Sequence, residues 1–370
     1  MRTRVTELLG VEFPLFAFSH CRDVVAAVTG AGGFGVLGAV AYSPEELDRE
    51  LSWIDERVGG RPYGVDVLVP GRIAAGAGGS LVEAIPDVHR DFVSHLLRKY
   101  GVPASERMAG SGGDEAGRRV TADGAMGLVE VALKHPIRLI ASALGPPPAA
   151  MTERARAAGV PVAALAGTVE HARRQVAAGA DIVVAQGGEA GGHTGEISTM
   201  VLVPQVVDAV AVPVLAAGGI ADGRQMAAAL ALGAEGVWCG SVWLTTEEAE
   251  TSPALKRKLL DATSRDTVRS RSRTGKPARQ LRSAWTDEWD ESLESPGSLP
   301  MPLQMLLAES AHGRISRAAE AGNPGAQALA NYFVGQVVGQ LNQIKPARQV
   351  VYEILRDCAS TLDRLNGLTH

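Results

Sequence analysis

Residues 213–241 read PVLAAGGIADGRQMAAALALGAEGVWCGS and hold two short apolar runs, each followed by glycine, with a helix of small residues between them. Apolar runs that alternate with helical stretches predict a parallel sheet covered by helices. Glycines directly after a strand let backbone N–H groups approach an anion, and a helix that begins there adds a favourable partial charge. Barrels of eight strands commonly bind phosphate after strands seven and eight, so this stretch predicts a fold and a phosphate site together.

The same unit recurs toward the N-terminus. The eight candidate strands are Leu15–Phe18, Phe34–Leu37, Tyr63–Leu68, Leu139–Ser142, Pro161–Leu165, Asp181–Ala185, Pro213–Ala216 and Gly236–Cys239. Eight strands with intervening helices predict an α/β chain folded as a (β/α)8 TIM barrel. An open, doubly wound sheet could use the same units, so the strand count does not decide the architecture alone.

Two regions do not fit the repeat. Residues 70–135 are too long for one crossover and contain a probable helix, which indicates a lid-like excursion over the barrel mouth. Residues 251–370 lack strand patterns, and we predict that they form a helical appendage that packs on a barrel spanning residues 1–250. Its expected helices are Pro253–Thr263, Leu303–Ala321, Ala326–Gln343 and Ala347–Leu365. We interpret the basic run Arg265–Arg282 as a solvated segment rather than one that folds over the phosphate end.

Composition excludes several classes of protein. The net charge is −5, which argues against a nucleic-acid binder, because no excess of cations meets a phosphate backbone. The three cysteines are far apart in sequence, which argues against a disulfide framework and a structural metal site. We find neither the apolar core of a signal peptide nor an apolar run of about 18 residues that could span a membrane. We therefore expect a cytoplasmic protein with neither membrane nor nucleic acid as a partner.

The loop after the sixth predicted strand, QGGEAGGHTG (186–195), is the most distinctive stretch of the chain. Five glycines allow close approach of a flat or anionic group, and Gln186, Glu189 and His193 would lie at the barrel mouth, where barrels carry their functional residues. We predict a catalytic role for His193. His20 follows the first strand and is a candidate for substrate contact. Gln336 is a weaker one, which a surface amide explains equally well.

These motifs resemble the nitronate monooxygenase family, formerly called 2-nitropropane dioxygenases. The similarity rests on the order of GGEAGGH (187–193), AAGGIADGR (216–224) and the pair Gly240-Ser241, and extends to LGVEFP (9–14) and GQVVG (335–339). It covers most of the chain except residues 70–135 and about 287–300.

The resemblance implies an enzyme that uses non-covalent FMN to oxidise alkyl nitronates with O2 to a carbonyl compound and nitrite. Nitronates or nitroalkanes and O2 would be its small-molecule partners, and a homodimer is one of the oligomeric states left open. His193 would act on the nitro compound, as a base or a hydrogen-bond partner. The residues implied to contact FMN are Asp66, Gln186, Gly191, Gly192, Gly218, Gly219, Trp238, Cys239, Gly240 and Ser241. Of these, Gly218, Gly219, Gly240 and Ser241 would bind its phosphate.

Two short segments depart from the family pattern. The first strand is usually followed by Ala-Pro-Met, whereas this chain reads Ala17-Phe18-Ser19-His20-Cys21, which puts substrate choice in doubt. The third usually carries Gly-Val-Asn, whereas this chain has Gly64-Val65-Asp66. An ionised aspartate accepts hydrogen bonds but does not donate them, so we expect its contact to the flavin to differ.

Three other readings stay open. An FMN-dependent enoyl reductase would share the barrel and phosphate site but take hydride from NAD(P)H. A flavin-free barrel isomerase, lyase or nucleotide dehydrogenase would hold a phosphorylated substrate at the same glycines. Inosine monophosphate dehydrogenases are one such class, but they use a nucleophilic cysteine, for which Cys239 is a poor match. A non-catalytic flavin or phosphate sensor would not require His193 in the glycine-rich loop.

Overall fold

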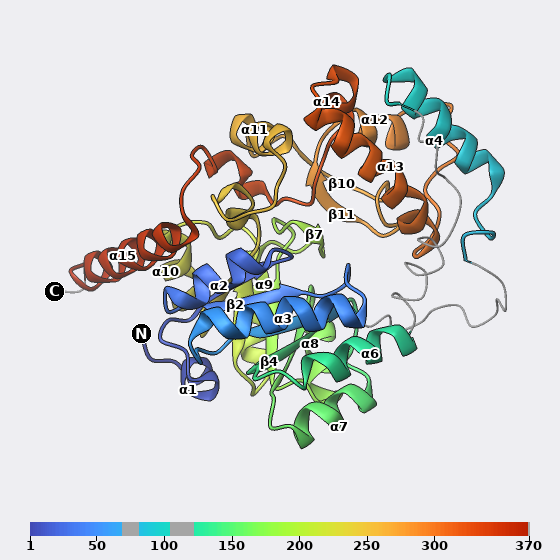
Figure 1. The fold of residues 1–370 in the computed structure, drawn as a ribbon. Helices are drawn as coiled ribbons and strands as arrows, with labels where there is room; N and C mark the ends of the chain where they lie inside the picture. The colour runs from blue at the N-terminus through green and yellow to red at the C-terminus, as the bar shows by residue number, and fades with distance from the viewer. Residues whose placement is uncertain (69–80, 104–121, 369–370) are drawn as a thin grey trace.

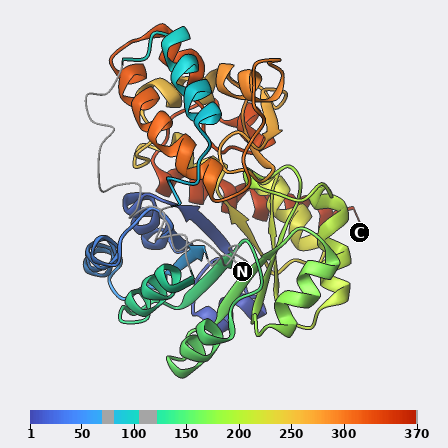
Figure 2. The same ribbon diagram turned by 90° about the vertical axis from the view of Figure 1, so that its right-hand side faces the viewer.

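Eight parallel strands close into a barrel at the centre of the molecule (Figures 1 and 2). The computed structural model describes residues 1–68, 81–103 and 122–368. The barrel strands are β1 (Leu15–Ser19), β2 (Phe34–Gly38), β3 (Gly64–Leu68), β4 (Leu139–Ala143), β5 (Val162–Ala166), β6 (Ile182–Gln186), β8 (Val214–Ala217) and β9 (Gly236–Cys239). The predicted (β/α)8 barrel is confirmed, and the open sheet is excluded because β9 pairs with β1.

Side chains alternate between the barrel interior and the layer beneath the helices, because successive residues of a strand point to opposite faces. Large apolar side chains fill the interior, among them Phe16, Phe34, Leu139, Ile182 and Leu215. The outer layer consists mostly of valine, alanine and leucine, which pack against the helices. The barrel is therefore a packed core, and its accessible chemistry lies where the strands end.

Helices surround the strands. They are α1 (Arg4–Leu9), α2 (Arg22–Gly30), α3 (Pro44–Val58), α6 (Ala122–Ala132), α7 (Ala149–Ala157), α8 (Val169–Ala177), α9 (Thr199–Ala209) and α10 (Gly223–Ala231). Their ends follow local sequence signals: α3 starts with a capping box between Ser43 and Glu46 and stops at Gly59, which has a φ of 60°. Within the described residues, none of the helices combines the length and apolar composition that a membrane crossing requires.

A second unit stands on the carboxyl ends of the strands, and we call residues 81–103 and 253–340 the cap (Figures 1 and 2). It contains α4 (Asp87–Lys99), α11 (Pro253–Asp261), β10 (Thr267–Ser270), β11 (Ala278–Leu281), α12 (Ala284–Asp290), α13 (Leu303–Glu320), α14 (Pro324–Leu329) and a 3-10 turn, η2 (Gln336–Gln340). Phe92 and Leu96 of α4 share one apolar core with Trp285 and Trp289 of α12 and Leu307 of α13. The helix predicted within the excursion, α4, therefore belongs to the cap, whereas α6, which also lies within residues 70–135, packs on the barrel against α3 and β3.

The prediction of a purely helical appendage is wrong at β10 and β11. These strands pair with each other, and β11 also pairs with the short strand β7 (Gly192–His193). The reading of Arg265–Arg282 as a solvated segment is also wrong, because Ser270, Ser272 and Gln280 are buried. Sequence periodicity missed the hairpin because polar side chains fill several of its buried positions, and their partners include the distant residues Gln304 and Asn331.

The predicted helix Ala326–Gln343 is likewise wrong. Helix α14 ends at Leu329, and the chain continues without helix until Gln336. Tertiary contacts hold this segment, since Leu281 N–H donates to Tyr332 O at 2.9 Å and Phe333 forms a bridge with Gln280. These contacts with the hairpin outweigh the helical propensity of the local sequence.

The last helix, α15 (Ala347–Asn366), packs against α10 and α2 on the outside of the barrel, not on the cap (Figure 1). Its buried face includes Val351, Ile354 and Cys358. A side chain on Gly223 would place Cβ 2.1 Å from Cys358 N and 2.3 Å from Ile354 O, so α10 and α15 meet through backbone. The predicted appendage 251–370 therefore divides between the cap and the barrel.

We predict that Gly223→Ala lowers the thermal unfolding midpoint, because the added methyl group forces α15 off α10 and overpacking costs about 1–3 kcal/mol. Gly313→Ala is the matched control. Its Cβ would come no nearer than 3.6 Å to the flexible end of Arg317, so this variant should be neutral or gain about 0.5–1 kcal/mol from helix propensity. Equal midpoints for the two variants would contradict the predicted role of Gly223.

Candidate active site

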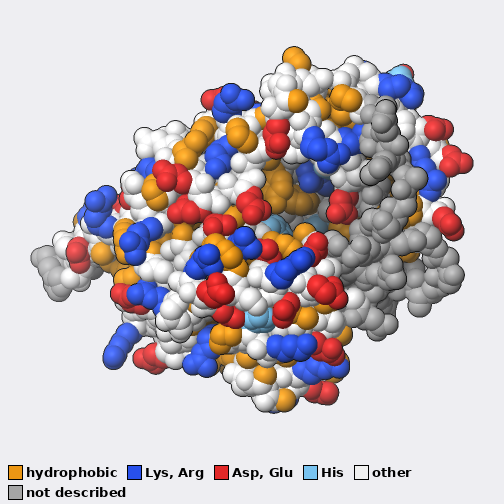
Figure 3. Space-filling model, in the orientation of Figure 1, with side chains coloured by type: hydrophobic (Ala, Val, Ile, Leu, Met, Phe, Trp, Pro, Cys, Tyr) orange, Lys and Arg blue, Asp and Glu red, His pale blue; other side chains and the backbone are white. Residues whose placement is uncertain are grey.

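A cavity of about 960 Å³ lies between the carboxyl ends of the barrel strands and the cap. In Figure 3 the surface is hollowed between these two parts, and histidine and hydrophobic side chains are visible inside. Twelve of the thirteen predicted site residues line it: His20, Asp66, Gln186, Gly191, Gly192, His193, Gly218, Gly219, Trp238, Cys239, Gly240 and Ser241. Gln336 does not, since its side chain is exposed and its backbone N–H donates to Glu189 O.

Unbonded backbone donors mark one end of this cavity. Gly218 and Gly219 adopt φ values of 99° and 71°, which favour glycine. Among the described residues, no acceptor bonds the N–H of Gly219, Gly240 or Ser241. Backbone donors left without acceptors in a lined cavity suit an anion such as a phosphate.

The start of α10 contributes less to this end than predicted. Asp222 caps the helix, accepting from Gln225 N–H at 2.9 Å, and Arg224 N–H donates to Asp357 of α15. Carboxylates of the protein thus already occupy donors of the first turn. The anion site rests on the loop glycines rather than on the helix N-terminus.

His193 is fixed at the opposite side by the cap. Its backbone pairs with Ala278 of β11, and Nε2 lies 2.8 Å from Thr274 Oγ1. We assign the Thr274 hydroxyl hydrogen to Lys276 O, 3.2 Å away, which makes Thr274 Oγ1 the acceptor of Nε2–H of His193. This network leaves Nδ1 as the basic nitrogen of the ring. Burial, with a smaller contribution from the charge of Lys276, lowers the pKa of His193 to about 4, so the imidazole is neutral at pH 7.

Aromatic rings form the floor of the cavity. The ring of Trp238 stacks between Phe16, with centroids 6.1 Å apart, and Phe18, at 6.4 Å. His20 meets Phe18 edge-on at 5.2 Å, and its Nδ1 lies 2.9 Å from Gly38 O. Burial lowers the pKa of His20, so this ring is also neutral. The departure from the family pattern at Ala17–Cys21 thus places one aromatic ring and one neutral imidazole beside the floor.

Asp66 lies in the middle of β3, lines the cavity and is 6% exposed. Burial alone raises its pKa to about 8, so the side chain is a protonated carboxylic acid at neutral pH. The expectation that Asp66 cannot donate a hydrogen bond is therefore wrong, because it assumed an ionised side chain. A protonated carboxyl can donate one hydrogen bond toward the cavity, as an asparagine amide would.

The glycine-rich loop is shaped by close contact with the chain itself. A Cβ on Gly191 would lie 2.8 Å from Val334 C, and one on Gly335 would lie 2.5 Å from Glu189 O. Gly335 N–H donates to Ser241 Oγ at 2.8 Å. Glycine is thus required at position 191 because the backbone at Val334 passes close to it, independently of any ligand in the cavity. Glu189 does not serve as a free carboxylate, because both its oxygens accept from Thr199 N–H.

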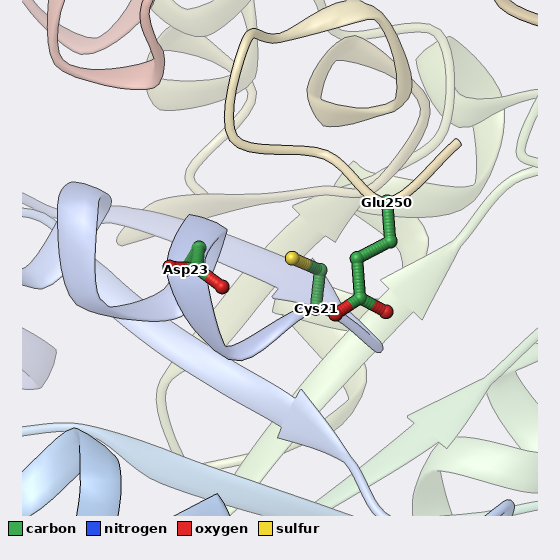
Figure 4. A group of neighbouring side chains, drawn as sticks. All are labelled: Cys21, Asp23 and Glu250. Atoms are coloured by element: carbon green, nitrogen blue, oxygen red, sulfur yellow. The ribbon is translucent and has the colours of Figure 1, made fainter. Parts of the chain in front are cut away.

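The cysteines offer no activated thiol. Cys239 packs in the apolar layer outside the strands, where burial raises its pKa to about 12. Burial also raises the pKa of Cys21 and Cys358. In Figure 4, Cys21 lies between Asp23 and Glu250, with one ligand atom of each within 4.8 Å of the others. The Cys21 thiol donates to Glu248 O at 3.1 Å and stays protonated, so we assign this cluster no metal.

Several cavity residues escaped the sequence analysis because they come from the cap. Arg273, Thr274 and Lys276 lie on the turn between β10 and β11, and Tyr332 and Phe333 lie on the segment after α14. Met301, Met305 and His312 approach from α13 and the residues before it. The turn residues Gly275 and Pro277 were the one local signal that could have located the hairpin.

We predict that Asp66→Asn stabilises the protein increasingly as pH rises from about 4 to about 8. Over this range only the folded wild type keeps its proton, since the unfolded carboxyl ionises near 3.8. The wild type should thus lose about 1.4 kcal/mol of unfolding free energy per pH unit relative to the variant. Urea unfolding at pH 4.5, 6 and 7.5 measures this difference. A difference that does not change with pH would show that Asp66 is ionised in the folded protein.

Comparisons with known proteins identify the family of this chain. The nitronate monooxygenase family model matches residues 2–357. The "Putative monooxygenase Rv1533" of Mycobacterium tuberculosis is 62% identical over all of this chain and 99% of its own, and a "Probable nitronate monooxygenase" of Staphylococcus saprophyticus is 31% identical over 83% of this chain and 86% of its own.

Two solved structures share the whole architecture. A nitroalkane oxidase from Streptomyces ansochromogenes superposes with a TM-score of 0.79 and 29% identity, covering 98% of this chain and 100% of its own. FabK from Thermotoga maritima gives 0.74 and 30% identity, covering 100% and 99%. The chain is therefore an oxidoreductase that belongs to the nitronate monooxygenase family.

Proposed function

We propose that this protein uses FMN to oxidise alkyl nitronates with O2, yielding a carbonyl compound and nitrite. The observation that carries the proposal is the cavity itself. One end offers the unbonded N–H groups of Gly219, Gly240 and Ser241, and another presents the neutral imidazole of His193. The relatedness to nitronate monooxygenases and the nitroalkane oxidase supports the same reaction.

The residues present fit FMN. Its phosphate would sit on the loop glycines after β8 and β9, where donors lack acceptors. Its ring would lie over the aromatic floor, with the protonated carboxyl of Asp66 able to donate a hydrogen bond to a ring acceptor. When bound, the flavin supplies the redox chemistry between the nitronate and O2.

The protein's part is to bind, orient and move one proton. His193 Nδ1 can accept the proton of a neutral nitroalkane, because Nε2–H is held by Thr274. A nitronate has already lost that proton and requires no base. Burial and the charge of Lys276 lower the pKa of His193, and the negative charge of a bound nitronate would raise it. The charge would therefore favour a protonated imidazole that donates a hydrogen bond to the nitronate. We therefore expect His193 to matter more for nitroalkanes than for nitronates.

A second candidate is an FMN-dependent enoyl reductase that takes hydride from NAD(P)H. The likeness to FabK and the extension of the cavity into the cap favour it. A flavin-free enzyme with a nucleophilic cysteine is disfavoured, because burial keeps the thiol of Cys239 protonated in the layer outside the strands. A non-catalytic flavin sensor is also disfavoured, because flavin binding alone does not require a histidine with a fixed tautomer in the cavity.

The absorbance spectrum of the purified protein is the first measurement. We expect a flavin spectrum that is bleached by anaerobic addition of ethyl nitronate without NADH. Bleaching by NADH alone would favour the reductase. Absence of flavin, with no binding of added FMN, would contradict both candidates.

We predict that His193→Ala keeps its flavin but loses at least tenfold in kcat/KM for neutral nitroethane, with a smaller loss for ethyl nitronate, because only the nitroalkane needs a base. His171→Ala is the matched control, since His171 also lines the cavity but is exposed on α8. The kcat/KM of Thr274→Val for nitroethane should lie between those of His193→Ala and His171→Ala, because this variant removes the hydroxyl that fixes the His193 tautomer. Unchanged turnover in His193→Ala would remove His193 from the mechanism.

A further inference from the structure

Two arginines face each other across the hairpin that lies above the barrel (Figure 1). Arg269 on β10 is directly opposite Arg279 on β11, so both side chains project from the same face of the sheet. Like charges placed opposite each other destabilise a strand pair. Burial lowers the pKa of Arg279, and the charge of Arg269 lowers it further, while Glu189 has the opposite effect. The pair therefore costs folding free energy unless both guanidiniums find acceptors beyond the hairpin.

These acceptors lie in the glycine-rich loop. Nε of Arg279 donates to Gly188 O at 2.8 Å, and Nη2 of Arg269 donates to Thr194 O at 3.2 Å. Hydrogen bonds from a charged donor are stronger than those between neutral groups. Gly188 precedes His193 in the loop, and Thr194 follows it directly. The two guanidiniums thus hold the loop on both sides of the imidazole.

Both guanidiniums are themselves fixed. Nη1 of Arg279 donates to Thr267 Oγ1 at 3.1 Å, and Nη1 of Arg269 forms an ion pair with Glu196 at 3.1 Å. Within the described ranges no carboxylate pairs with Arg279, so the carbonyl of Gly188 and the hydroxyl of Thr267 are the acceptors that orient it. Neither arginine lines the cavity. They can therefore affect a bound ligand only through the loop.

The loop depends on such bonds because its own sequence gives it little order. Five of the ten residues 186–195 are glycine, which has no side chain to restrict φ and ψ. The loop is closed at its base, where Gly188 N–H donates to Ile197 O at 2.8 Å, and it pairs with β11 over only two residues. Thr274, which lies 2.8 Å from Nε2 of His193, is on the turn of the same hairpin. The hairpin thus carries both the partner of the imidazole and the cations that hold its loop.

We propose that Arg279, together with Arg269, is a positioning residue that keeps Nε2 of His193 against Thr274 and leaves Nδ1 available as the base. This inference rests on the proposed function, in which His193 accepts the proton of a neutral nitroalkane. A displacement of about 1 Å near reacting groups can lower a rate about a hundredfold. A loosened loop should therefore slow the reaction that needs the base and spare the oxidation of a nitronate, which needs none.

Kinetics with two substrates test this role. We expect Arg279→Met to lower kcat/KM for nitroethane by about tenfold or more and for ethyl nitronate by no more than about threefold. Arg279→Lys keeps a charged donor for Gly188 O and should recover most of the loss. Arg271→Met is the matched control, because Arg271 lies on the turn but is exposed and does not line the cavity. Arg279→Gln, which is uncharged and shorter, should show the same selectivity if Arg279→Met does not fold.

A spectroscopic measurement follows the imidazole without turnover. In protein labelled with 15N-histidine, the ring of His193 should carry its hydrogen on Nε2 alone, and His193→Ala identifies its resonances. We expect Arg279→Met to shift the resonances of the two ring nitrogens toward each other, because the Nε2–H and Nδ1–H tautomers then exchange. Arg271→Met should leave these resonances unchanged.

Equal losses for nitroethane and ethyl nitronate in Arg279→Met would assign Arg279 a structural role and overturn the proposal. Unchanged ring-nitrogen resonances in Arg279→Met would overturn it as well, whatever the kinetics. If the wild type oxidises neither nitro compound, the proposed function fails and the tautomer comparison alone decides. Shifted resonances in Arg279→Met would then uphold the positioning role, and unchanged ones would overturn it.

Discussion

The pairing of Gly192–His193 with Ala278–Arg279 joins the barrel to the cap, and the candidate site depends on it. A loop with five glycines has little conformational preference of its own, so an isolated barrel would not fix His193. The pairing supplies backbone order, and the turn between β10 and β11 supplies Thr274, whose hydroxyl lies 2.8 Å from Nε2 of the imidazole. The catalytic candidate is thus positioned by a segment about eighty residues further along the chain.

Burial sets the charge of an aspartate and three histidines that line the cavity. It keeps Asp66 protonated and the imidazoles of His20, His193 and His312 neutral at pH 7. A guanidinium loses its proton only at much higher pH, so the same burial leaves Arg273 charged. The cavity therefore combines neutral hydrogen-bonding groups, unbonded backbone donors and a charged guanidinium. Such a lining suits an anionic ligand at the loop glycines.

The cap is assembled from two distant parts of the sequence. Helix α4 shares an apolar core with α12 and α13, although about two hundred residues separate them. This core is distinct from the barrel core, so the barrel can keep its packing while the cap shapes the space above the strands. The segment that passes Gly191 and Gly335 then closes the cavity from one side. Under the proposed function, the cap would select the substrate and the barrel end would hold the redox cofactor.

The sequence by itself determined the eight strands, because each carries its own apolar run; no observed strand end differs from the expected one by more than one residue. The closure of these strands into a barrel was decided by the pairing of β9 with β1. The sequence also brought His193, Asp66 and the glycines of the phosphate end to one edge, since parallel strands place their carboxyl ends together. Only the tertiary structure decided the hairpin β10–β11 and the non-helical segment at Tyr332 and Phe333, because their partners are distant in sequence. The same long-range packing decided the protonation of Asp66 and the neutral state of His193, since burial depends on neighbours that no local pattern records.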